Sequence, residues 1–118
     1  MWHSVAVADF SINENSVDSG CTVLGLAGNL DLASASTMRA AGLAALAQPN
    51  CSTLVLDVTA LRLIDSTGIG SLVELHNHAQ QHDQRMVLRG VSANLTRVLT
   101  IAGLASFFNF DPPEGDHA

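Results

Sequence analysis

The sequence contains no lysine and no tyrosine, and only two cysteines and three prolines among its 118 residues. Two cysteines are too few for a disulfide-stapled secreted scaffold, and their spacing is not that of a zinc site. Apolar residues make up 47% of the chain and charged residues only 14%, a balance that excludes a disordered chain. No apolar run approaches the roughly 18 residues of a membrane span, and no signal peptide is recognisable. These absences predict a single globular, cytoplasmic domain that is not inserted in a membrane.

Positive charge is also scarce. Eleven acidic residues against five arginines give a formal net charge of −6, and the arginines are scattered along the chain. Affinity for nucleic acid comes mainly from clustered Lys and Arg. A nucleic-acid partner is therefore not expected.

The first part of the chain has the pattern of β-structure. Apolar residues alternate with the period of a half-buried strand over residues 4–12. Turn-forming residues follow at 13–16 and 18–20, after which residues 21–27 predict a second strand antiparallel to the first.

Helical and strand-like segments alternate over the rest of the chain. Helical spacing of apolar residues is found at residues 34–47, 66 to about 81, and 94–102. Strands are predicted at residues 53–58, 85–89 and, as a short edge strand, 107–110. Gly103 should end the last helix with a positive φ. We expect an α/β fold with a mixed sheet of four to five strands, helices packed against it, and the order β-β-α-β-α-β-α-β, comprising residues 1–111 and followed by a polar tail at 112–118.

Three consecutive N-cap residue types, Asp65, Ser66 and Thr67, open the second predicted helix. A helix uses only one residue as its cap, so the surplus hydroxyls are informative. A phosphate on Ser66 would lie beside unpaired N–H groups and the positive end of the helix dipole. Gly68 and Gly70 leave room there for the close approach of another molecule. An ordinary capped helix start is the alternative that the spacing leaves open.

Two segments carry a family resemblance: Val55-Leu56-Asp57-Val58 through Leu63-Ile64-Asp65-Ser66-Thr67-Gly68-Ile69-Gly70, and Gly28-Asn29-Leu30-Asp31. In this order they resemble the STAS domain, which sulphate transporters share with bacterial anti-sigma-factor antagonists, over residues 20 to about 110. The resemblance implies that Ser66 is a phosphoacceptor, with Thr67 the hydroxyl most easily mistaken for it. It also implies a partner-binding set of Asp31, Asp65, Ser66, Thr67, Gly68, Gly70 and Ser71.

The antagonist branch of the family implies a function in transcription regulation. The unphosphorylated protein would bind an anti-sigma factor that is also a serine kinase of the ATPase-fold type, and so free the sigma factor. Phosphorylation of Ser66 would abolish binding, and a phosphatase would reverse it. Two alternatives remain: a STAS subunit of a membrane-associated transporter complex, in which Ser66 need not be phosphorylated, and a STAS domain that senses a nucleotide or small ligand.

No catalytic set, P-loop or dinucleotide-binding motif is present in the sequence, so neither enzymatic activity nor a cofactor is expected. Glu74, His78 and His82 are spaced four residues apart, as metal ligands on one helix face could be. One helix rarely surrounds a metal alone, so we expect a solvated face and no metal. His76 is expected to be a partly buried core residue.

Cys21 and Cys51 each stand at or near the start of a predicted strand. Strands joined by one crossover helix begin at the same end of the sheet, so the two sulfurs would be close if the strands are neighbours. A redox-sensitive disulfide at the end opposite Ser66 is then possible, although free buried thiols are common in a reducing compartment.

Overall fold

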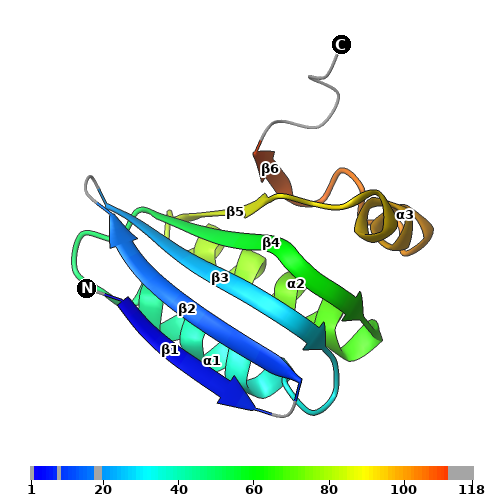
Figure 1. Cartoon of the computed structure of the whole chain (residues 1–118). Coiled ribbons are helices and arrows are strands. Elements are labelled where there is room, and N and C mark those ends of the chain that lie inside the picture. The colour runs from blue at the N-terminus through cyan, green and yellow to red at the C-terminus, as the bar shows by residue number, and fades with distance from the viewer. Residues whose placement is uncertain (1, 8, 18–19, 112–118) are drawn as a thin grey trace.

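Six strands form one sheet in which spatial order follows chain order. The computed structural model describes residues 2–7, 9–17 and 20–111 (Figure 1). The strands are β1 (Trp2–Val7), β2 (Phe10–Val17), β3 (Cys21–Leu30), β4 (Thr53–Ile64), β5 (Arg85–Arg89) and β6 (Asn109–Asp111). The helices are α1 (Ala35–Leu46), α2 (Ser66–Gln81) and α3 (Ala93–Ile101).

The sheet is mixed. β1, β2 and β3 pair antiparallel, whereas β3, β4, β5 and β6 pair parallel. Each parallel pair is joined by one helix, as parallel neighbours require a crossover. α1 and α2 lie side by side on one face of the sheet, and α3 lies beyond the end of β5 (Figure 1).

The core lies between the sheet and these two helices. Alternate residues of β3, Leu24 and Leu26, are fully buried, as are Met38 of α1 and Leu72 and Leu75 of α2. Burying a side chain of this size contributes roughly 1.5–3 kcal/mol. The apolar residues that recur at helical spacing in the sequence therefore form the inward faces of α1 and α2.

The prediction of a single strand over residues 4–12 is wrong. The structure divides residues 4–12 between β1 and β2, which form a hairpin, and residues 13–16 are strand residues rather than a turn. Asn13 pairs with Gly25 and Asn15 with Val23, so antiparallel pairing with β3 overrides the turn preference of asparagine. The sheet therefore has six strands rather than four to five, and the order begins with three strands. Residues 8 and 18–19 lie outside the described residues.

The rest of the predicted order is confirmed. The three helices and β5 lie within about one residue of their predicted positions, and Gly103 has φ +78°. β4 continues to Ile64, six residues beyond the predicted end, although its pairing with β5 ends at Asp57. β6 is Asn109–Asp111 rather than 107–110, because Phe108 is a buried core residue that precedes the strand. The predicted tail at 112–118 lies outside the described residues.

Candidate functional site

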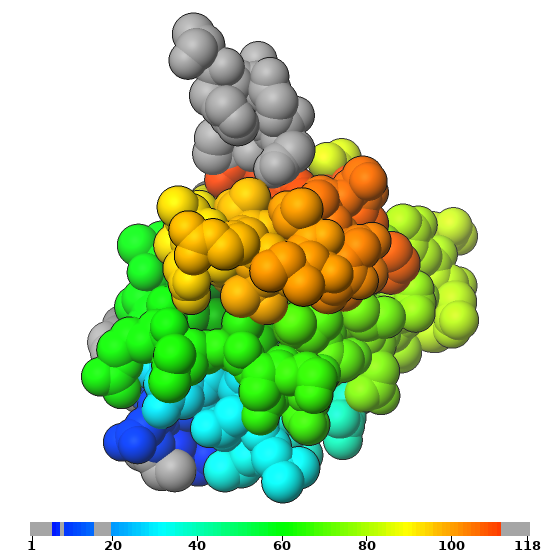
Figure 2. All heavy atoms as spheres, turned by 90° about the vertical axis from the view of Figure 1, so that its right-hand side faces the viewer, coloured from blue at the N-terminus to red at the C-terminus, as the bar shows by residue number. Residues whose placement is uncertain are grey.

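The parallel pairing of β3 and β4 brings two aspartates to the same end of the sheet. Leu30 and Ile64 form the last pair of the two strands, so Asp31 and Asp65 follow at equivalent positions. The backbone N–H of Asp65 donates to the Leu30 carbonyl at 3.2 Å. Figure 2 looks toward this end, where the cyan segment after β3 adjoins the green segment that leads into α2.

Asp65 is the N-cap of α2. Its Oδ1 accepts a hydrogen bond from the Gly68 N–H at 2.9 Å, and its Oδ2 accepts one from the Leu32 N–H at 3.3 Å. One carboxylate therefore caps the helix and fastens the loop after β3 to it. The ordinary capping role, which the sequence leaves open for any of three residues, belongs to Asp65.

Ser66 and Thr67 are the first two residues of α2, and both are exposed. Within the described residues, neither hydroxyl has a hydrogen-bond partner, because Asp65 supplies the cap. Their backbone N–H groups are among the first four of the helix and have no partner within it. A phosphate on Ser66 would lie next to these donors and to the positive end of the helix dipole.

Two members of the predicted partner-binding set lie inside the fold. Gly68 is buried, and a Cβ added there would lie 2.3 Å from the Leu30 carbonyl oxygen. Ser71 is 1% exposed, and its hydroxyl donates to the Gly68 carbonyl at 2.6 Å. Both residues therefore pack inside the first turns of α2 rather than on its surface. A Cβ on Gly70 would meet nothing within 4 Å, so that position is open.

The loop after β3 is held by its own polar groups. Asp31 Oδ1 accepts from the Ala33 N–H at 3.0 Å, and the Ser34 hydroxyl donates to the Asn29 carbonyl at 2.7 Å. Ion pairs among the described residues join Arg39 to Glu74 and Arg89 to Asp111, and neither involves Asp31 or Asp65. The two aspartates at the site therefore carry negative charge that no described ion pair compensates.

Two leucines near this site are exposed, and no local sequence pattern predicts their exposure. Leu32 is 78% exposed and Leu63 is 62% exposed, whereas most large apolar residues of the described chain are buried or half-buried. Leu63 lies on the part of β4 that extends beyond its pairing with β5 and is paired there with Asn29 of β3. We call Asp31, Leu32, Leu63, Asp65 and Ser66 the end face.

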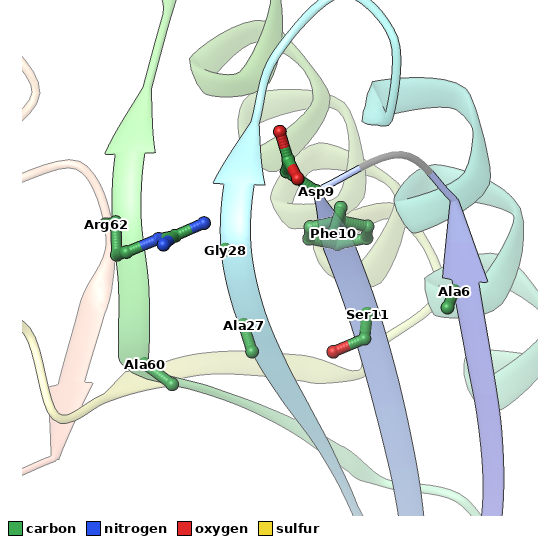
Figure 3. Close-up of a pocket in the computed structure, with 8 residues that line it drawn as sticks. All are labelled: Ala6, Asp9, Phe10, Ser11, Ala27, Gly28, Ala60 and Arg62. Atoms are coloured by element: carbon green, nitrogen blue, oxygen red, sulfur yellow. The ribbon is translucent and has the colours of Figure 1, made fainter.

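A hollow on the opposite side of the sheet from α1 and α2 was also missed by sequence analysis. It measures about 390 Å³. Ala6, Ser11, Ala27 and Ala60 are register partners across four strands and line it, with Asp9 and Arg62 also in its lining (Figure 3). Only tertiary pairing brings these small residues together, so no local pattern could have revealed the hollow.

The histidine-rich face of α2 has other partners. Glu74 forms an ion pair with Arg39 of α1 at 3.3 Å. The His78 and His82 rings stack with centroids 4.2 Å apart, and His82 Nδ1 lies 2.8 Å from the His78 carbonyl oxygen. No group of three or more potential ligands suited to a metal ion is found among the described residues.

His76 is a core residue. It is 5% exposed, and its ring lies against Phe107 and Phe108 at centroid distances of 4.5 and 5.6 Å. Its Nε2 lies 3.3 Å from Gln80 Nε2, while its buried Nδ1 has no partner. Burial without a compensating charge lowers the pKa of His76 from its ordinary value of 6.5.

This pKa shift predicts a loss of stability in mild acid. Because the unfolded chain binds the proton more readily than the folded one, the contribution of neutral His76 is complete above pH 6.5 and is lost as the pH falls below it. The measurement is the free energy of unfolding at about pH 7.5 and about pH 5.5. We expect a larger fall for the wild type than for His76→Phe, and an equal fall would contradict the assignment.

Cys21 and Cys51 are free thiols, and both are half-buried. They line one surface hollow of about 210 Å³ near the start of β3 and β4, at the end of the sheet opposite Ser66. Cys51 packs against the core, whereas Cys21 is not among the residues that do so. The redox-sensitive disulfide stays a prediction.

Together, these features define a small α/β domain with a mixed sheet and an exposed hydroxyl at the start of an aspartate-capped helix. A sequence profile of the family described as "Mlab, STAS domain" matches residues 14–108. The chain belongs to the STAS domain family, which confirms the resemblance seen in its motifs. No helix in the described ranges is long and apolar enough to cross a membrane.

Curated relatives match part of the chain. It is similar to the anti-sigma-B factor antagonists of Listeria monocytogenes and Listeria innocua, with 33% identity over 63 residues in each case. That match covers 53% of this chain and 55% of each relative, so the chain spans about half the length of the curated relatives it matches.

Solved structures share the fold. An anti-sigma factor antagonist from Mycobacterium paratuberculosis is similar with a TM-score of 0.72 and 23% identity, covering 95% of this chain and 94% of that one. A sulfate transporter family protein from Wolinella succinogenes has a TM-score of 0.70 and 21% identity, covering 82% and 81%. The phosphorylated form of the Bacillus cell fate determinant SpoIIAA has a TM-score of 0.66 and 22% identity, covering 84% and 89%.

Proposed function

We propose that this domain is an anti-sigma-factor antagonist. Its unphosphorylated form binds an anti-sigma factor that is also a serine kinase of the ATPase-fold type, which releases the sigma factor. Phosphorylation of Ser66 ends the binding, and a phosphatase restores it. The observation that carries this proposal is the exposed, unpartnered hydroxyl of Ser66 on a helix whose cap is Asp65. The similarity to the anti-sigma-B factor antagonists supports it.

Because the end face is already acidic, the charge of one phosphate is sufficient to switch off partner binding. Phosphorylation adds about −1.5 to −2 charge, beside Asp65 and near Asp31. Like charges facing each other across an interface cost several kcal/mol, and a shift from nearly all bound to nearly all free takes roughly 5.5 kcal/mol. The unpaired N–H groups at the start of α2 donate hydrogen bonds to the phosphate where it stands, so the domain does not have to refold.

A paired capture experiment tests the switch. Ser66→Ala and Ser66→Asp proteins are used as baits in a lysate of the source cell, and the retained proteins are identified and quantified. We expect an ATPase-fold anti-sigma factor on the alanine bait and its loss from the aspartate bait, because the carboxylate adds charge at the same place.

Thr67 provides the matched control, because its side chain is the neighbouring exposed hydroxyl of the same helix turn. Thr67→Ala and Thr67→Asp should differ less than the Ser66 pair. Equal retention of the anti-sigma factor by both Ser66 baits would contradict the proposal that phosphorylation of Ser66 ends binding.

A transporter subunit is the second candidate. It is favoured by the structural similarity to a sulfate transporter family protein. In that case both Ser66 baits would retain the same transporter components, because the function would not depend on the charge at Ser66. The same capture experiment therefore separates the two candidates.

A further inference from the structure

α1 and α2 cover one face of the sheet, and the opposite face points toward the viewer in Figure 1. Residues two apart in a strand, and residues paired across strands, lie on the same face. The opposite face therefore holds the hollow of about 390 Å³ and, two residues before Ala27 on β3, the register row that runs from Gly25 through Asp57 and Arg89 to Asp111. We call this surface the outer face, and none of the described helices packs on it.

The outer face is formally neutral, although the chain has a net charge of −6. Three of the five arginines lie on it together with three aspartates: Arg62, Arg85 and Arg89, and Asp9, Asp57 and Asp111. A protein of high net charge repels its own copies. A neutral face is therefore the surface through which two copies of this chain can approach each other most closely.

Arg62 and Asp9 line the hollow from opposite sides. Figure 3 shows Arg62 extending from β4 over Gly28 of β3, with Asp9 on the far side of Gly28. The two side chains form no ion pair with each other or with another described residue. The side chains of Ala27 and Ala60, which line the hollow beside them, are small. The hollow therefore has a base and an acid at its rim and room for a side chain of another molecule.

We propose that the outer face binds a second copy of this domain in a symmetric dimer, independently of the proposed function. In a two-fold symmetric interface, each residue meets on the partner the residue that meets it in return. A two-fold axis along β3 places Arg62 of each copy against Asp9 of the partner subunit, so two ion pairs form together. The aliphatic stem of each Arg62 enters the hollow of the other copy, where the alanines leave space for it.

Sedimentation equilibrium with charge-reversed variants tests this dimer. Over about a hundredfold range of protein concentration, the dimer fraction of the purified wild-type chain should increase with concentration. Arg62→Asp and Asp9→Arg should each raise the Kd of the dimer at least about tenfold, because like charges then face each other. The double variant Arg62→Asp with Asp9→Arg should dimerise like the wild type. An equimolar mixture of the two single variants should form heterodimers, because one copy supplies both acids and the other both bases.

Arg97→Asp is the matched control for Arg62→Asp. It changes the net charge by the same amount at an exposed position of α3 and should leave the dimer unchanged. Ala60→Gln provides a second test that reverses no charge: Ala60 is exposed, so the fold should be retained while the larger side chain occupies the hollow and weakens the dimer. Circular dichroism checks that each variant is folded.

Three results would overturn the dimer. The first is a wild-type chain that is monomeric over the whole concentration range. The second is a dimer that Arg62→Asp and Ala60→Gln weaken no more than Arg97→Asp does. The third is a failure of both the double variant and the mixed single variants to restore association, which would show that Arg62 and Asp9 do not meet across the interface.

Discussion

Gly68→Ala is expected to destabilise the domain by about 2–3 kcal/mol, roughly 10 °C in melting temperature. The added Cβ would lie 2.3 Å from the Leu30 carbonyl oxygen and 3.0 Å from Ile64 Cγ1. The first of these atoms belongs to the backbone of β3, which cannot move aside as a side chain could. The variant must push the start of α2 away from the sheet and weaken the Asp65 cap. Thermal and urea unfolding measure the loss.

Gly70→Ala is the matched control for Gly68→Ala. It lies two residues further along the same helix, and its Cβ would meet nothing within 4 Å. Alanine is better than glycine in a helix interior by about 1 kcal/mol, so Gly70→Ala should raise the melting temperature slightly. If both variants were stabilised, the close contact of α2 with β3 at Gly68 would be wrong.

Gly28→Ala is expected to cost about 3 kcal/mol or more, for two separate reasons. Gly28 has φ +94°, a conformation that L side chains rarely adopt, and its Cβ would lie 1.8 Å from the Asp9 carbonyl oxygen. That oxygen accepts a hydrogen bond from the Asn29 N–H at 2.8 Å. Denaturant unfolding, which detects the loss of cooperative structure, is the measurement.

Gly25 is the control for Gly28 because it lies in the same strand. A Cβ there would be 3.8 Å from the Asn13 carbonyl oxygen, an ordinary contact distance. Gly25→Ala should therefore be neutral or slightly stabilising, by less than about 1 kcal/mol. A similar loss in both variants would show that β3 tolerates no side chain at either position and would contradict the special role of Gly28.

Gly28 and Gly68 both have a structural role within the fold. The sequence suggests that Gly68 makes room for a partner. In the structure, the Leu30 carbonyl of β3 occupies the space that a side chain at Gly68 would need. Only the side-by-side placement of residues 30 and 68, far apart in the chain, distinguishes these two roles. At Gly70, by contrast, an added Cβ would meet no atom within 4 Å.

Local information was sufficient for the helices and the central strands. In α1 and α2 the inward residues recur at helical spacing, so burial of Met38 and Leu72 follows from the pattern alone. The hairpin of β1 and β2 was missed because asparagines in β2 carry a turn preference that long-range pairing with β3 outweighs. Strand ends were misjudged where pairing and apolar pattern end at different residues, as in β4.

By itself, the sequence determined the α/β class, the order of the helices and the position of Ser66 at a helix start, because periodicity and capping act within a few residues. Only the tertiary structure decided that Asp65 is the cap that also binds Leu32, that Ser71 is buried, and that Leu32 and Leu63 are exposed beside Ser66. These features depend on contacts between β3, β4 and α2, which no local pattern encodes.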